Sequence, residues 1–159
     1  QKVFQESNML ETVKRRVIDI GPAEPLDSVQ AEIKSITATL CGYIANKKKD
    51  SHAKLVQRMY QYTEEMYANP DLTLYRVAEY VERPEKYISQ LFKEVTGVNY
   101  SDHLIKVRME KAAELLKESN HTVDDIAARV GYNSSHSFRR AFKRLIGVTP
   151  SVYRQTLDE

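Results

Sequence analysis

The chain has 159 residues, of which 42% are hydrophobic and 29% are charged, and its formal net charge is +2. This length is enough for one or two small domains with a buried core. No segment reaches the roughly 18 consecutive apolar residues of a membrane span or shows the pattern of a signal peptide. The single cysteine, Cys41, cannot form an internal disulfide, so the composition excludes a disulfide-stabilised secreted domain and is typical of the reducing cytoplasm.

The spacing of apolar residues predicts an all-α protein, because they recur three and four positions apart while glycine and proline number only five each. Residues 1–50 are expected to form a helical N-terminal segment, with one helix to about Ile20 and a break at Gly21, Pro22 and Pro25. The second helix of this segment carries an apolar row, formed by Ile33, Ile36, Leu40 and Ile44. Residues 47–50 (KKKD) are expected to be a linker.

The N-terminal segment has two expected roles. The chain starts with Gln1 instead of methionine, so we expect it to be part of a longer protein in which residues 1–50 connect to another domain. The apolar row needs burial, and a homodimer contact through residues 1–50 would also provide it.

An internal repeat occupies the rest of the chain, residues 51–156. A helix through Leu55 and Met66 is expected to stop at Asn69-Pro70-Asp71, and residues 74–97 then align with residues 123–147, at an offset of 49 before a turn and 50 after it. Between the copies, residues 101–118 predict one long central helix spanning about 27 Å at 1.5 Å per residue.

Each copy has the layout of a helix-turn-helix unit: a short helix, a tight turn and a longer helix. In the second copy, Thr122 and Asp125 resemble a capping box, Gly131 suits a left-handed turn, and Asn133 or Ser134 can cap the next helix. In the first copy, Pro84 is expected to begin the longer helix. The apolar face of the second longer helix is formed by Phe138, Ala141, Phe142 and Leu145, and further predicted core residues are Leu91, Phe92 and Ile146.

The polar faces of the two longer helices have the chemistry for reading DNA, because Arg, Lys, Gln, Ser, His and Glu can all bond base edges in the major groove. The predicted base-reading residues are Glu85, Lys86, Ser89 and Gln90 in the first copy and Ser135, His136, Arg139 and Arg140 in the second.

Basic residues concentrate in the second copy, where residues 126–157 contain no Asp or Glu. A local basic surface of this kind favours contact with DNA phosphates. The predicted phosphate-binding residues are Lys93, Arg129, Lys143, Arg144 and Arg154.

Two segments closely resemble the DNA-binding domain of AraC/XylS family transcription regulators: LYRVAEYVERPEKYISQLFKEVTG (74–97) and IAARVGYNSSHSFRRAFKRLIGVTPSVYR (126–154). The most specific parts of the match are Gly131-Tyr132, then Phe138 and Phe142, and finally Gly147-Val148-Thr149-Pro150 with Tyr153-Arg154. The resemblance implies two helix-turn-helix subdomains joined by the long central helix, with two recognition helices entering successive major grooves of double-stranded DNA. It also implies a bacterial, cytoplasmic regulator that activates or represses transcription together with RNA polymerase. The helical segment before the domain resembles a connector to a receiver or sensor domain.

This sequence departs from the family pattern in its first copy. Glu82 stands where the family usually has the turn glycine, and Glu79 and Glu85 lie close to it in sequence. Acidic side chains disfavour phosphate contact, so we expect the second unit to supply affinity and the first to adjust specificity.

Two other classes of function are an enzyme and a protein-interaction module. The four histidines show no metal-ligand spacing, and no phosphate-binding glycine loop or nucleophile motif is present, so we predict no enzymatic activity, metal or cofactor. The alternative to a DNA-binding regulator is a helical protein-interaction module with reduced DNA binding in the first unit. The acid-free run argues against it for the second unit.

Overall fold

The computed structural model describes residues 2–21, 25–118 and 120–156, with side chains from residue 8 onward. These residues form eight α-helices and no strand, which confirms the predicted all-α class. The chain divides into an N-terminal unit, Gln1–Ser51, and a C-terminal unit, His52–Glu159. Helix α2 contributes to both units.

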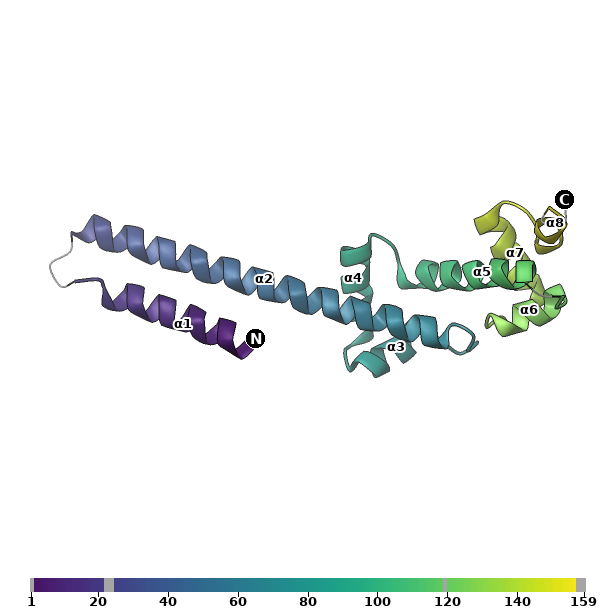
Figure 1. The fold of residues 1–159 in the computed structure, drawn as a ribbon, viewed down its shortest axis with the longest axis horizontal. Coiled ribbons are helices and arrows are strands. Elements are labelled where there is room, and N and C mark those ends of the chain that lie inside the picture. The colour runs from purple at the N-terminus through teal and green to yellow at the C-terminus, as the bar shows by residue number, and fades with distance from the viewer. Residues whose placement is uncertain (1, 22–24, 119, 157–159) are drawn as a thin grey trace. The chain divides into compact units, whose positions relative to one another are not determined.

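The N-terminal unit is a helical hairpin of α1 (Lys2–Ile18) and the first half of α2 (Leu26–Met66), as Figure 1 shows. Near the hairpin's connection, Arg16 donates to a Glu32 carboxylate oxygen at 2.7 Å and to the Ser35 hydroxyl at 2.7 Å. Gly21 and Pro25 lie outside the helices, and the rest of the predicted break, including Pro22, is outside the described residues.

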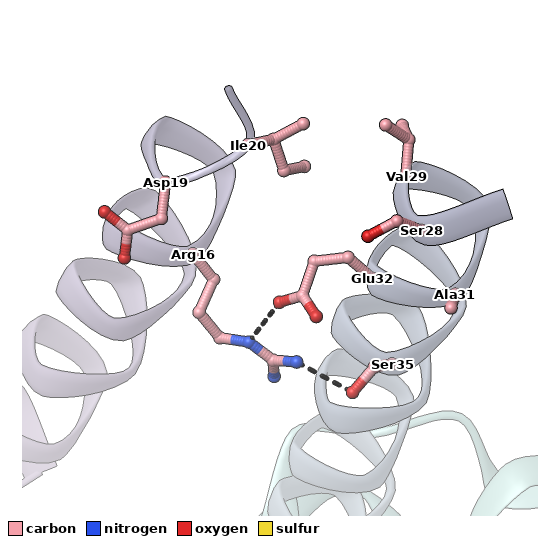
Figure 2. A pocket seen from close by; sticks show the side chains of 8 residues that line it. All are labelled: Arg16, Asp19, Ile20, Ser28, Val29, Ala31, Glu32 and Ser35. Carbon is pink, nitrogen blue, oxygen red and sulfur yellow. Dashed lines mark hydrogen bonds and ion pairs between the residues drawn. The ribbon is translucent and has the colours of Figure 1, made fainter. Parts of the chain in front are cut away.

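A pocket lies between the end of α1 and the beginning of α2, and Figure 2 shows the Arg16 guanidinium turned toward Glu32 and Ser35 there. The carboxylate of Glu32 already balances the charge of this arginine. Of the apolar row on α2, only Ile36 is buried, whereas Ile33 and Ile44 keep 54% and 62% of their surface exposed. The row is therefore not buried as a whole within this hairpin.

The prediction of a linker at residues 47–50 is wrong, because α2 continues through these residues without a break. The sequence contains no glycine or proline between Tyr43 and Asn69. Lysine is a good helix former, so a run of charge alone does not end a helix.

The first subdomain of the C-terminal unit consists of the second half of α2, α3 (Leu74–Val81), α4 (Glu85–Thr96) and the beginning of α5 (Tyr100–Glu118). Helix α2 ends at Met66, ahead of Asn69 and Pro70, as predicted. Its core is formed by Val56, Met59, Leu72, Val77, Ala78, Val81, Ile88, Leu91, Phe92, Tyr100 and Leu104.

The second subdomain is built from the rest of α5 with α6 (Val123–Arg129), α7 (Ser135–Ile146) and α8 (Pro150–Gln155). Its core is formed by Met109, Ala112, Leu116, Ile126, Ala127, Val130, Phe138 and Phe142. Helix α5 packs against α4 in one subdomain and against α6, α7 and α8 in the other, so it is the predicted central helix (Figure 1).

Most predicted core positions are confirmed, since Leu91, Phe92 and Phe142 are almost completely buried. Two positions of α7 differ. Ile146 is half-buried, and Leu145 is 45% exposed, because it lies about 60° beyond the buried Phe142 on the helix wheel and points past the core.

Candidate nucleic-acid interface

The second helix-turn-helix unit, α6–turn–α7, is held by the local signals read from its sequence. The Asp125 backbone N–H donates to the Thr122 hydroxyl at 3.1 Å, and Thr122 donates back to the Asp125 carboxylate from its backbone N–H and its hydroxyl, completing the capping box. These hydrogen bonds lower the pKa of the Asp125 carboxyl. Gly131 has φ +82°, and Ser134 caps α7 through the Ser137 backbone N–H. The predicted turn is confirmed, with Ser134 as the cap.

The first unit, α3–turn–α4, makes its turn without glycine. Glu82 has φ 56° and is the non-glycine residue with positive φ among the described residues. It therefore adopts the left-handed conformation at the position where the family pattern has glycine. Pro84 is the residue before α4, which begins at Glu85, so the expectation that Pro84 begins the helix is wrong by one position.

The outward face of α7 is strongly basic. At about 100° per residue, Phe138 and Phe142 define the buried side, and His136, Arg140, Lys143 and Arg144 fall opposite them. Arg140 and Arg144 line a shallow surface hollow with Ser137 and Ala141. Ser135 and Arg139 lie on the flank of the helix, beside α6.

Asp124 of α6 binds both residues of that flank. Its Oδ1 atom accepts a hydrogen bond from Arg139 Nη2 at 2.8 Å and another from the Ser135 hydroxyl. Two of the predicted base-reading residues are thus held by a carboxylate of the neighbouring helix. Asp124 was not among the residues predicted from the sequence, because its contacts cross the turn between two helices.

The outward face of α4 has mixed charge. All five predicted contact residues of α4 are exposed: Lys86, Gln90 and Lys93 on its outward face, and Glu85 and Ser89 on the flank that matches Ser135 and Arg139 of α7. Tyr75 of α3, which sequence analysis did not single out, is 56% exposed and matches Asp124 at the repeat offset of 49. Its hydroxyl is close to the Glu79 carboxylate, whose hydrogen bond and charge raise the pKa of Tyr75.

The predicted phosphate contacts divide into two groups. Lys93, Arg129, Lys143 and Arg144 are exposed and accessible to a ligand. Arg154 is half-buried, and its Nη2 donates to the backbone carbonyl of His121 at 2.6 Å. This hydrogen bond ties α8 to the segment before α6. Phosphate contact by Arg154 stays a prediction, and it would have to use the other terminal nitrogen, Nη1.

Arg108 of α5 links the two subdomains. Its guanidinium donates to the backbone carbonyls of Tyr67 at 2.9 Å and Asn69 at 2.8 Å, and lies 5.5 Å from the centre of the Tyr132 ring. A Cβ atom added to Gly131 would come within 2.6 Å of the Tyr67 carbonyl oxygen and 2.9 Å of Arg108 Nη2. The end of α2 and the turn of the second unit therefore meet at one buried arginine, whose pKa burial lowers.

In the described part of the chain, no group of three His, Cys, Asp or Glu side chains could hold a metal ion. No helix among those residues is long and apolar enough to cross a membrane. Two helix-turn-helix units with exposed polar recognition helices, joined by one shared helix, define the class of double helix-turn-helix DNA-binding proteins.

Comparison with known proteins identifies the family. Residues 77–156 match the family described as "Helix-turn-helix domain". The HTH-type transcriptional activator RhaR of Yersinia pseudotuberculosis is 42% identical over 71 residues, covering 45% of this chain and 24% of the relative. An uncharacterized HTH-type transcriptional regulator of Bacillus subtilis, YtdP, is 36% identical over 85 residues, covering 54% of this chain and 11% of the relative. The chain thus spans a quarter or less of the length of these curated relatives.

Solved structures agree with the sequence relatives. The C-terminal domain of AraT, a response regulator from Geobacillus stearothermophilus, is 42% identical with a TM-score of 0.63, over 64% of this chain and 84% of that one. The DNA-binding domain of AdpA, solved in complex with a target DNA, is 25% identical with a TM-score of 0.60, over 64% of this chain and 90% of that one. The chain belongs to the AraC family of helix-turn-helix transcription regulators, a non-enzymatic DNA-binding family.

Proposed function

We propose that this chain is the DNA-reading part of a transcription regulator and that α4 and α7 enter successive major grooves on one side of the duplex. The observation that carries the proposal is the repeated geometry: each recognition helix buries its aromatic side against α5 and leaves a polar face exposed. One shared helix then fixes the separation of the two reading surfaces. The similar domain of AdpA was solved in complex with a target DNA, which supports DNA as the ligand of this fold.

In this proposal the base-reading residues are those on the outward and flanking faces of the two helices. Arg139 and Arg140 read guanine, whose O6 and N7 atoms accept two hydrogen bonds from a guanidinium. Gln90 reads adenine, and Lys86 reads guanine or binds a phosphate. Glu85, Ser89, Ser135 and His136 complete the reading surfaces, while Lys93, Arg129, Lys143, Arg144 and Arg154 bind phosphates.

The two units contribute unequally. The outward face of α7 carries Arg140, Lys143 and Arg144, whereas the matching positions of α4 carry Gln90, Lys93 and Glu94. The second unit therefore supplies most of the attraction to the phosphate backbone. The first unit adds less affinity and contributes mainly to the choice of bases.

Partners beyond DNA rest on the relatives and on exposed apolar surface. RhaR is named a transcriptional activator and AraT a response regulator, which supports the role of an activator. We propose RNA polymerase as its partner and the bacterial cytoplasm as its location. A homodimer through residues 1–50 is supported by the exposed Ile33 and Ile44 of the N-terminal unit. Both partners stay predictions.

The direct test of DNA binding is its dependence on salt. Neutralising five phosphates, one for each proposed phosphate-binding residue, should release enough counterions to weaken binding about five-hundredfold between about 50 and 200 mM salt. Fluorescence anisotropy with a labelled duplex measures this, and a random duplex should show a similar slope at lower affinity. An affinity that stays constant over this range would contradict the proposed function.

A further inference from the structure

Asp124 joins the two helices of the second unit through polar contacts on their exposed side. It lies in the first turn of α6, and its Oδ1 atom accepts from both Arg139 Nη2, at 2.8 Å, and the Ser135 hydroxyl. Both donors belong to the flank of α7 that faces α6. The carboxylate therefore acts on two neighbouring reading residues at once.

The contact between Asp124 and Arg139 is open to solvent. The side chains of Arg139 and Asp124 keep 53% and 66% of their surface exposed. An ion pair this exposed contributes little to folding, because water and salt screen it. We therefore expect the ion pair to affect DNA binding more than folding, through the bases and phosphates that approach the Arg139 guanidinium.

We propose that Asp124 is a specificity-determining residue that positions Arg139 for a guanine edge and disfavours its capture by a phosphate. Bidentate reading of guanine requires one orientation of the guanidinium plane, and a carboxylate that already holds one nitrogen restricts the orientations open to Arg139 before DNA binds. The same negative charge repels a phosphate oxygen, which penalises binding to random sequence. This inference rests on the proposed function.

The chain contains its own comparisons. Arg140 follows Arg139 directly but points to the hollow formed with Ser137 and Arg144, away from Asp124. In the first unit the residues that match Asp124 and Arg139 are Tyr75 and Ser89, which cannot form such an ion pair. Among the two neighbouring arginines, the restraint therefore acts on Arg139 and not on Arg140, and its removal should change reading at the base pair that Arg139 contacts.

The experiment compares the full 159-residue chain with Asp124→Ala, Asp124→Asn and Arg139→Ala. Anisotropy titrations at one salt concentration use three duplexes: the selected site, the site changed at the base pair whose preference Arg139→Ala abolishes, and a random sequence. Asp124→Ala should bind the random duplex about threefold to tenfold more tightly and lose about tenfold in discrimination at the Arg139 base pair. Asp124→Asn keeps an oxygen acceptor without the charge, so it should fall between wild type and Asp124→Ala.

Glu94→Ala is the matched control, because it removes the same charge from the outward face of α4, in the unit that lacks Arg139. It should tighten binding to all three duplexes by a similar factor and leave the discrimination at the Arg139 base pair unchanged. Equal melting temperatures for the variants show that the fold is kept.

Two results would overturn the inference in distinguishable ways. If the wild-type chain discriminates between the duplexes and Asp124→Ala discriminates equally well, the role of Asp124 is refuted while the proposed function stands. If the wild-type chain prefers no duplex over random sequence, the proposed function is refuted and this inference with it.

Discussion

Arg140 and Lys143 are neighbours on the outward face of α7, but we assign them different tasks. Replacing Arg140 by Ala should cost about 1–3 kcal/mol of binding free energy and relax the preference at one base pair. Replacing Lys143 by Ala should weaken all sequences by one factor and reduce the salt slope by about 1. Titrations of both variants against the selected and a mutated site separate the two effects. Uniform weakening by Arg140→Ala would reassign Arg140 to phosphate contact.

For single residues, exposure was predictable from the sequence, whereas the hydrogen-bond partner of a side chain was not. The five candidates on α4 are all exposed, because helical periodicity alone decides which side of a helix faces the core. Asp124 and Arg154 show what periodicity cannot predict. Asp124 meets Arg139 across a turn, and Arg154 meets the carbonyl of His121, 33 positions earlier in the chain.

Two glycines at the ends of helices, Gly131 and Gly147, differ in how closely other atoms approach them. Gly131 and Gly147 both have positive φ, at +82° and +94°, but a Cβ at Gly131 would meet backbone and Arg108 while a Cβ at Gly147 would meet nothing within 4 Å. Gly147→Ala should therefore cost about 1 kcal/mol of unfolding free energy from backbone strain, and Gly131→Ala about 3 kcal/mol. Denaturant unfolding of both variants measures the difference. Equal losses would mean that the close approach at Gly131 relaxes without cost.

Among the elements, those with local signals were predictable. The capping box at Thr122, the cap at Ser134 and the stop before Pro70 depend on residues within a few positions of one another, and the structure has all three. The linker predicted at residues 47–50 was wrong, because a run of lysines does not end a helix. Glu82 shows the reverse case: the family pattern marks position 82 as part of a turn, but a glutamate there does not indicate the left-handed conformation that it adopts.

Arg108 joins the two helix-turn-helix units, so we expect it to hold the two recognition helices at a fixed separation. Inserting one base pair between half-sites rotates them by about 34°, which a rigid pair of recognition helices cannot follow. We expect wild type to lose at least about tenfold in affinity, or 1.4 kcal/mol, on such an insertion. Arg108→Lys should lose much less, because a lysine cannot donate to the Tyr67 and Asn69 carbonyls in the same fork geometry.

A duplex carrying only the second half-site is the control for this variant. Arg108→Lys should bind it as wild type does, because the reading face of α7 is unchanged. If the variant instead lost affinity for the single half-site and the spaced sites alike, Arg108 would serve folding of the second unit and not the spacing of the two. This coupling was not predictable from the sequence, because it joins residues 41 positions apart through a buried side chain.

The central claim is that one chain reads DNA with two recognition helices of the same fold. Selection of bound sequences from a random duplex pool by the wild-type chain tests it most directly. We expect enriched sites with two clusters of preferred base pairs whose centres lie about 10 base pairs apart, with the cluster read by α7 the stronger. Enrichment of a single cluster, or of none, would contradict reading by two helices.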